Sequence, residues 1–130
     1  MELNKISPWA WQDNFGYSQA IEVKQSEGTL YCSGQTAMTA DGQPFNGTME
    51  EQIALSLDNL KTVIEKAGYE IKNLVRLNIY TTSIPETFAA WGTLAGWLQK
   101  HGSVPTSTLL EVKALAFPEL KIEFEATVIK

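Results

Sequence analysis

The sequence predicts an α+β fold in which two helices cover one face of a mixed sheet of five or six strands. Several segments alternate apolar and polar residues with a period of two, which is typical of half-buried strands. Two other segments repeat apolar residues at intervals of three and four, which is typical of amphipathic helices. The segments follow in the order strand, strand, helix, strand, helix, strand, strand. Two helices can cover only one face of such a sheet, so we expect the other face to be bare.

Length and charge limit the classes of protein to which this chain can belong. Its 130 residues fit a single domain over residues 1–130 with a core of its own. The formal net charge is −5, and a surface of this sign repels a phosphate backbone, so we expect no nucleic-acid partner. No apolar run reaches the roughly 20 residues of a membrane span, which argues against a membrane partner. Residues 1–5 lack the basic and apolar parts of a secretory signal, so we expect a cytoplasmic location.

One cysteine and one histidine leave few options for metal or redox chemistry. Cys32 has no second cysteine with which to form a disulfide or a multi-cysteine zinc site. We expect it to be a small buried hydrophobic side chain. His101 lies in the last turn of a predicted helix, where a partial positive charge suits the helix dipole. The sequence contains no phosphate-binding loop, nucleophile elbow or dinucleotide fingerprint, so we expect no metal and no cofactor.

The N-terminal quarter is predicted to hold an irregular arm followed by a hairpin. Residues 1–16 are rich in tryptophan, proline and asparagine and show no period, so we expect an arm that lies on the body. Trp9 and Trp11 on this arm are candidates either for the wall of a cleft or for filling a core or interface. Two β-rich runs follow at 17–24 and 29–35, separated by a turn. We expect these runs to pair as a hairpin.

Both predicted helices have clear start signals. Thr48 and Glu51 form a capping box, in which the threonine hydroxyl accepts a backbone N–H and the glutamate reaches back. The helix that begins there ends at Gly68, because glycine is a usual C-terminal stop. Pro85 stands near the first position of the second helix, where its missing N–H costs little, and His101 marks the end of that helix.

Three further strands are predicted at 71–82, 103–112 and 119–129, the last two as neighbours. In the last run the even positions are apolar, whereas Glu123 and Glu125 belong to the polar, odd positions. One face of this strand therefore belongs to the core. Its polar face must meet water, a ligand or a partner subunit.

The bare face of the sheet is predicted to be an interface between copies of the chain. We assign Glu111 and Glu123 to this face, together with Leu109 and Ile129. A mixed apolar and charged composition fits a surface packed against sister subunits better than one that faces bulk water. The sequence therefore favours a homo-oligomer.

Four separated motifs run along the chain. They are Phe15–Ala20, Cys32–Gln35, Gln52–Leu60, and a closing motif in which Val104 and Pro105 lead to Glu111, Val112 and Ile122–Ala126. In this order they resemble the landmarks of the RidA (YjgF, L-PSP) family over about residues 15–128. The resemblance implies a chorismate-mutase-like fold, a homotrimer whose sheets line a central barrel, and small-molecule clefts between subunits. The best known members hydrolyse reactive enamines and imines to keto acids and ammonia, without metal or cofactor.

The resemblance also implies roles for three residues. Tyr17 matches a tyrosine of the cleft, Ser33 the serine before Gly-Gln, and Glu123 the catalytic carboxylate that positions water. Each position has a plainer interpretation. The tyrosine is also compatible with a packed aromatic, the Ser33-Gly34 pair with a β-bulge, and Glu123 with an ion pair to a lysine of another subunit.

Three further substrate-binding positions depart from the family pattern. Ser107 stands where the deaminating members carry an arginine, Leu109 where they carry a cysteine, and Gly92 where they carry an asparagine. A guanidinium gives a carboxylate two parallel charge-assisted hydrogen bonds, which a serine cannot imitate. Its loss should cost about 2 to 4 kcal/mol of substrate binding, or about thirty- to a thousand-fold. Arg76 could replace it only if its side chain reached the same cleft.

The sequence thus leaves two main hypotheses and one weaker one. The first is a trimeric hydrolase of the deaminase type that acts on a small reactive enamine or imine other than an ordinary 2-imino acid. In it Glu123 positions water, Ser33 and Ser107 form hydrogen bonds, and Tyr17 closes the pocket. The second is a non-catalytic trimer of the same fold that binds a small metabolite. A ribonuclease role fits poorly with the acidic surface.

Overall fold

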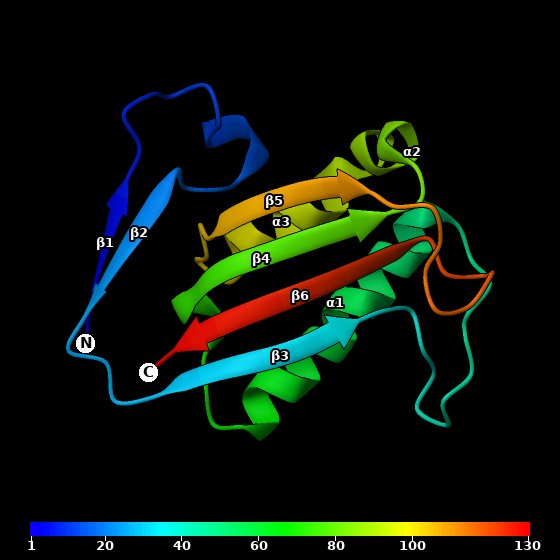
Figure 1. Ribbon diagram of the computed structural model, residues 1–130, viewed down its shortest axis with the longest axis horizontal. Coiled ribbons are helices and arrows are strands. Elements are labelled where there is room, and N and C mark those ends of the chain that lie inside the picture. Colours follow the sequence, from blue (N-terminus) through cyan, green and yellow to red (C-terminus); the bar gives the residue numbers. More distant parts are fainter.

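The computed structural model describes residues 1–130 and confirms the α+β class (Figure 1). In chain order the elements are β1 (Glu2–Ile6), the short 3-10 helix η1 (Asp13–Phe15), β2 (Ala20–Lys24), β3 (Thr29–Gln35), α1 (Met49–Lys66), the 3-10 helix η2 (Ile71–Asn73), β4 (Leu74–Thr81), α2 (Ile84–Ala89), α3 (Trp91–Lys100), β5 (Thr106–Glu111) and β6 (Ile122–Ile129). None of the helices combines the length and the apolarity that a membrane span requires.

The six strands form two sheets rather than the single sheet of five or six strands that the sequence predicts. β3, β6, β4 and β5 lie side by side in this order, and β1 pairs with β2 in a separate ribbon. The ribbon stands beside one end of the four-stranded sheet, at the left of Figure 1. The larger sheet is mixed, as expected, because β5 runs parallel to β4 whereas β6 is antiparallel to β3 and β4.

The predicted hairpin between residues 17–24 and 29–35 does not form. β2 pairs with β1, and β3 pairs with β6. The turn between β2 and β3 is tied to the C-terminus, because the N–H groups of Glu27 and Gly28 donate to the carbonyl of Lys130 at 2.6 and 2.8 Å. These bonds direct the chain from the ribbon to the edge of the large sheet. The arm is also not irregular throughout, because β1 occupies its start.

β4 lies between the two closing strands. The prediction that 103–112 and 119–129 are neighbours is therefore wrong, since β5 pairs with one side of β4 and β6 with the other. A strand, helix, strand unit favours a parallel strand directly beside the first one. β5 takes that place after α3, and the loop that follows β5 carries the chain across to the free side of β4.

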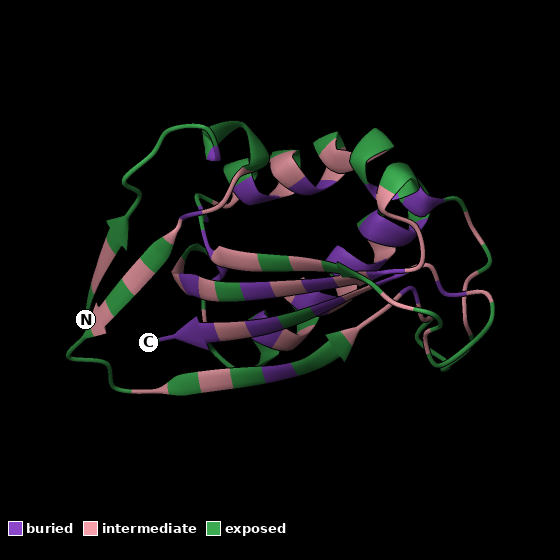
Figure 2. Ribbon diagram, turned by 45° about the horizontal axis from the view of Figure 1, so that its top comes forward, coloured by how far each residue is buried: buried purple, intermediate pink, exposed green.

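The helices cover one face of the four-stranded sheet, and the core lies between them (Figure 2). Leu77 and Ile79 of β4 and Phe124 of β6 point into this core and are at most 1% exposed. They meet the apolar stripe that the sequence predicts for α1, which is buried: Ile53, Leu57, Leu60 and Ile64. The predicted alternation along 122–128 is confirmed, because its even positions are buried.

The opposite face of the sheet is bare, as predicted. It is turned toward the viewer in Figure 1, with α1 and α3 behind the strands. The side chains on this face alternate with the core residues along β4 and β6. Ile129 belongs to this set, as predicted, but most of its members are polar: Arg76, Asn78, Tyr80, Glu123 and Glu125.

The prediction that places Leu109 and Glu111 on the bare face is wrong. In the parallel pairing of β4 with β5, Leu109 stands opposite Ile79 and Glu111 opposite Thr81. Because paired residues share a face of a sheet, both lie on the helix-covered side. Leu110 is on the bare side and is 50% exposed. The short run Thr-Ser-Thr-Leu-Leu-Glu contains two consecutive leucines, so its alternation does not reveal which set is buried.

The predicted capping box of the first helix is confirmed. Thr48 Oγ1 accepts the N–H of Glu51 at 3.1 Å, and Glu51 Oε1 accepts the N–H of Thr48 at 2.9 Å. α1 ends at Lys66, and Gly68 follows with a φ of 80°, a conformation that favours glycine.

The second predicted helix is interrupted, so that two helices occupy its place. α2 and α3 meet at Ala90, whose φ of −106° and ψ of 13° leave the helical range. Two contacts fix α2 to the ends of β4 and β5. Glu111 Oε1 accepts the N–H of Ile84 at 2.9 Å, and Thr87 Oγ1 donates to Thr81 Oγ1 at 2.7 Å. This anchorage holds α2 where its aromatic side chain can contribute to the site described next.

Candidate functional site

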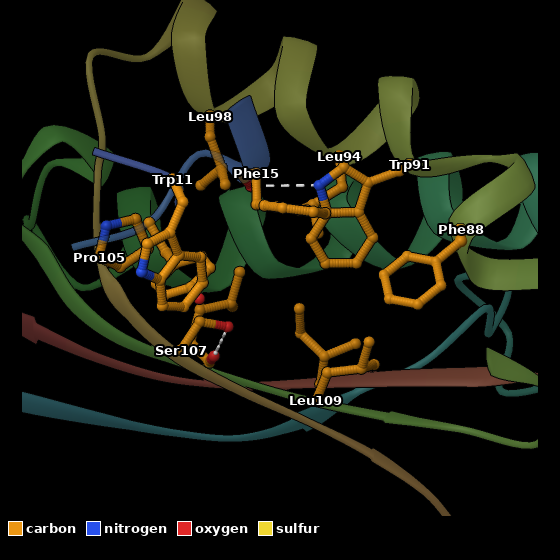
Figure 3. A pocket seen from close by; sticks show the side chains of 12 residues that line it. Trp11, Phe15, Phe88, Trp91, Leu94, Leu98, Pro105, Ser107 and Leu109 are labelled. Atoms are coloured by element: carbon orange, nitrogen blue, oxygen red, sulfur yellow. Dashed lines mark hydrogen bonds between the residues drawn. The ribbon is translucent and has the colours of Figure 1, made fainter. Parts of the chain in front are cut away.

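An apolar pocket of about 250 Å³ opens between the N-terminal arm, α2, α3 and β5 (Figure 3). Its lining comprises Trp11, Phe15, Tyr17, Leu77, Ile79, Phe88, Trp91, Leu94, Leu98, Pro105, Ser107 and Leu109. None of these residues is a lysine, arginine, histidine, aspartate or glutamate. Besides the tyrosine hydroxyl and the indole N–H groups, the serine hydroxyl is the only polar side-chain group. The pocket therefore suits an apolar body that carries few polar atoms.

Three aromatic rings form one wall of this pocket. The ring centroids of Phe15, Phe88 and Trp91 lie 5.6 to 6.4 Å apart in edge or tilted arrangements, which is the contact range of aromatic pairs. Trp91 Nε1 donates to the carbonyl of Phe15 at 3.1 Å, so the arm is tied to α3 (Figure 3). Trp11 and Tyr17 make a further edge contact at 6.4 Å.

Ser107 has a fixed hydrogen-bond direction. Its Oγ donates to the carbonyl of Leu77 at 2.7 Å, across the parallel pairing of β5 with β4. A hydroxyl has a single proton, so this bond leaves Ser107 Oγ as an acceptor toward the pocket. Leu109, two residues further along β5, adds an apolar side chain to the same lining.

A second group of predicted residues lies on the bare face, where Glu123 sits against Gly34. A Cβ atom at Gly34 would come within 2.5 Å of the Glu123 carboxyl group, so only glycine leaves the room that this side chain occupies. No hydrogen bond within the chain stabilises the charged form of Glu123. Burial raises the pKa of its carboxyl group, and the neighbouring Glu125 carboxylate raises it further.

Ser33 and Gly34 lie at an irregularity of β3. The pairing of β3 with β6 shifts register between Cys32 and Gln35, which confirms the β-bulge. Gln35 Nε2 donates to the carbonyl of Ser33 at 3.2 Å. The bulge therefore contains Gly34, the residue that leaves room for the Glu123 side chain, and we call this place the seat of Glu123. Ser33 lies beside it on an exposed stretch of the strand.

Glu125 is the counterpart of Glu123 two positions along β6. Its Oε1 accepts from Tyr80 Oη at 2.9 Å and from Asn78 Nδ2 at 3.1 Å. These hydrogen bonds lower the pKa of Glu125. The surroundings of two carboxyl groups on the same face of one strand thus shift their pKa values in opposite directions, which is a common arrangement around reactive groups.

The structure separates the predicted site residues into two sets within one chain. Tyr17, Ser107 and Leu109 share the apolar pocket, whereas Ser33 and Glu123 lie on the opposite face of the sheet. The sequence prediction that the serine of β5 and the glutamate of β6 stand on neighbouring strands is wrong, because β4 separates them.

Two other residues considered from the sequence do not reach the pocket. Gly92 follows the pocket residue Trp91 but is absent from the lining, and a Cβ atom there would meet open space. Arg76 is on the bare face, in register with Thr106, and lines a polar groove of about 630 Å³ that adjoins the apolar pocket, because Tyr17 and Ser107 line both. Arg76 is therefore absent from the apolar lining but shares the adjoining groove with Ser107.

Sequence reasoning missed the aromatic wall. Phe88 and Trp91 are three residues apart on the predicted apolar stripe of the second helix, where they resemble core residues. In the structure Phe88 is 49% exposed, and the wall closes only through Phe15 of the arm. The aromatic residues of the arm were the only feature of the sequence that pointed to an aromatic pocket wall, and Trp11 does line the pocket.

The sequence and the fold of this chain are similar to those of known proteins. The family model described as Endoribonuclease L-PSP matches residues 10–130. The mitochondrial protein mmf2 of Schizosaccharomyces pombe is 42% identical over 74 residues, which cover 57% of this chain and 55% of that protein. A RutC family protein of Buchnera aphidicola is 28% identical over 88% of this chain and 87% of its own length. The crystal structure of YyfB from Yersinia pestis, a protein of unknown function of the conserved Rid family, covers 100% of both chains with 34% identity and a TM-score of 0.89.

Proposed function

Because this chain belongs to the endoribonuclease L-PSP family, we propose that it is a hydrolase of the deaminase type for a small, reactive enamine or imine. The observation that supports this best is the seat of Glu123 on the bare face. Its carboxyl group has a raised pKa, lies against Gly34 and has no hydrogen-bond partner within the chain to hold it charged. A carboxyl group with a raised pKa is a stronger base than an ordinary glutamate, which suits it to accept a proton from water.

We propose that the complete site forms between subunits of a homotrimer. Within one chain the pocket and Glu123 lie on opposite sides of the sheet, so a second copy must supply the other half. The bare face supports this arrangement because it leaves two large side chains uncovered, Tyr31 at 79% exposed and Leu110 at 50% exposed. Tyr31 pairs with Thr127 of β6, on the same side as Glu123.

The proposed reaction needs only water and the carboxylate. Glu123 accepts a proton from water while the oxygen bonds to the imine carbon, and it passes this proton to the imine nitrogen, which gives the carbinolamine. Glu123 then accepts the proton of the carbinolamine hydroxyl and delivers it to the nitrogen, so that the carbon–nitrogen bond breaks, the carbonyl forms and ammonia leaves. The balance is one imine and one water for one carbonyl compound and one ammonia.

The substrate proposed for this reaction lacks the carboxylate of an ordinary 2-imino acid. No cationic side chain lines the pocket, and Ser107 uses its proton on the carbonyl of Leu77. A carboxylate that entered would lose its hydration and find no charged partner.

A kinetic assay with imines generated in situ tests this function. An amine oxidase acting on an amine without a carboxyl group supplies one imine, and an amino-acid oxidase supplies a 2-imino acid. We expect the protein to accelerate ammonia release from the first, and Glu123→Gln to reduce that acceleration by about 100-fold or more. The matched control is Glu125→Gln, which changes the neighbouring carboxylate on the same face and should keep most of the activity. If the folded protein accelerates hydrolysis of neither imine, the proposed function is wrong.

The alternative function is a non-catalytic trimer that binds a small metabolite. One observation favours it, namely that the pocket of a single chain contains no acid or base except the tyrosine hydroxyl. Ligand binding without turnover, with an affinity that Glu123→Gln leaves unchanged, would support this alternative. A cytosolic location is part of either proposal and is checked by cell fractionation, since a relative such as mmf2 is named as mitochondrial.

A further inference from the structure

We infer that the pocket binds the uncharged apolar end of the substrate, with the size of about one aromatic ring, and recognises one N–H or O–H donor on it through Ser107. This inference rests on the proposed function, because it names the substrate class of the same site. It points to imines and enamines derived from apolar or aromatic amines, and away from those derived from amino acids.

The size and lining of the pocket support an apolar group of this kind. Its volume of about 250 Å³ exceeds the roughly 150 Å³ of an apolar protein cavity that binds benzene. Leu94 and Leu98 of α3 and Leu77 of β4 form buried parts of the lining. Burial of apolar surface against such side chains is the main source of affinity that this pocket offers.

The aromatic wall does not have the arrangement that would bind a cation. Aromatic sites that recognise a ligand cation form a cage in which several ring faces surround it. The rings of Phe15, Phe88 and Trp91 instead contact each other, with centroids 5.6 to 6.4 Å apart, so they leave no space between them. The lining also contains no carboxylate that would neutralise a bound cation.

Hydrogen-bond direction then defines the polar part of the ligand. Trp91 Nε1 is already engaged by the carbonyl of Phe15, and Ser107 Oγ donates to the carbonyl of Leu77. Ser107 can therefore accept a hydrogen bond from the ligand but cannot donate one without losing its own. An imine or enamine N–H, or the O–H of the carbinolamine that forms during hydrolysis, can donate to Ser107, whereas a carboxylate only accepts and could bond to the Trp11 and Tyr17 donors of the lining but not to Ser107.

Calorimetric titration with four stable probes tests the inference: benzyl alcohol, benzyl methyl ether, benzoate and benzylammonium. We expect benzyl alcohol to bind about five-fold or more tightly than its methyl ether, because only the alcohol donates to Ser107. Both charged probes should bind more weakly than the alcohol. Ser107→Ala should remove the preference of alcohol over ether. Thr106→Ala is the matched control, because Thr106 Oγ1 also donates to a main-chain carbonyl, that of Val75, but lies on the other face of β5.

Three results would overturn the inference: tightest binding of benzoate or benzylammonium, an alcohol preference that persists in Ser107→Ala, or binding of none of the probes. The two proposals fail separately. If the probes behave as expected but no imine is hydrolysed, the deaminase function fails and the ligand class stands. If 2-imino acids are hydrolysed as fast as carboxylate-free imines, the ligand class fails and the deaminase function stands.

Discussion

Gln52 and Glu123, two polar residues on opposite sides of the four-stranded sheet, differ in how the fold satisfies them. On the helix-covered side, Gln52 is fully buried and makes three hydrogen bonds, to the carbonyls of Phe45 and Glu119 and from the N–H of Lys121. On the bare side, Glu123 keeps a raised pKa and no stabilising hydrogen bond. A polar group that the fold has satisfied contributes to stability, whereas one left unsatisfied near the surface is available for chemistry. Changes on the two faces should therefore affect different properties.

The largest effect on stability is expected at Phe124, on the covered face. Its ring is 0% exposed, so Phe124→Ala should lower the free energy of unfolding by about 3 to 5 kcal/mol through lost burial and a cavity. Urea denaturation followed by circular dichroism measures this change. Glu125→Ala, the next residue on the opposite face, is the control and should lower the free energy of unfolding by only about 1 kcal/mol, because it loses hydrogen bonds at an exposed carboxylate but creates no cavity. Similar losses in both variants would contradict the division between the faces.

The second prediction concerns Gly34, where activity and stability should separate. In Gly34→Ala the new methyl group displaces the flexible end of the Glu123 side chain. The free energy of unfolding should therefore change by less than about 1 kcal/mol. Imine hydrolysis should fall by about 10-fold or more because the carboxylate loses its place. The control is Gly96→Ala in α3, where a Cβ atom meets open space and both properties should be retained. Full activity in Gly34→Ala would show that the seat of Glu123 is not required.

The smallest effect is a pair of opposite pH dependences. The pKa of Glu123 is raised in the folded state, so its protonated form favours folding, and this contribution is lost as the pH rises through the raised value. Glu123→Gln should therefore be more stable than the unmodified protein at neutral pH. This advantage should vanish below the ordinary pKa of 4.5.

Glu125 should behave in the opposite way. Its pKa is lowered by Asn78 and Tyr80, so its contribution to stability is present above the ordinary value of 4.5 and is lost as the pH falls through the lowered one. Glu125→Gln should be less stable than the unmodified protein at neutral pH, and the deficit should shrink in acid. Thermal melts across pH 3 to 8 check both variants, and the same sign in both would contradict the assigned environments.

Local features of the fold were predictable from the sequence, because they depend on residues close together in the chain. The capping box of Thr48 and the alternation along 122–128 are of this kind, and both are confirmed. Strand partners were not predictable, because they depend on distant contacts. The turn before β3 is hydrogen-bonded to Lys130, about 100 residues further along the chain, and the residues around Gly28 do not predict that bond.

The same distinction between local patterns and distant contacts explains which parts of the candidate site were predictable. Glu123 was assigned to the correct face because its strand alternates without ambiguity. Leu109 was assigned to the wrong face, because only the pairing of Ile79 with Leu109 settles which residues of β5 point toward the helices. The aromatic wall depends on a contact between Phe15 and Trp91, 76 residues apart, which no local pattern encodes.

The position of β6 between β3 and β4 has a consequence for how the chain folds during synthesis. β6 joins β3 to the rest of the sheet but follows β3, β4 and β5 in the chain, so it leaves the ribosome after them. Until then β3 has no partner in the sheet, and one edge of β4 is open. Domains that depend on such long-range pairing fold slowly, and their incomplete forms expose strand edges that aggregate. A nascent chain of this protein should therefore remain sensitive to proteases and should bind chaperones until β6 has emerged.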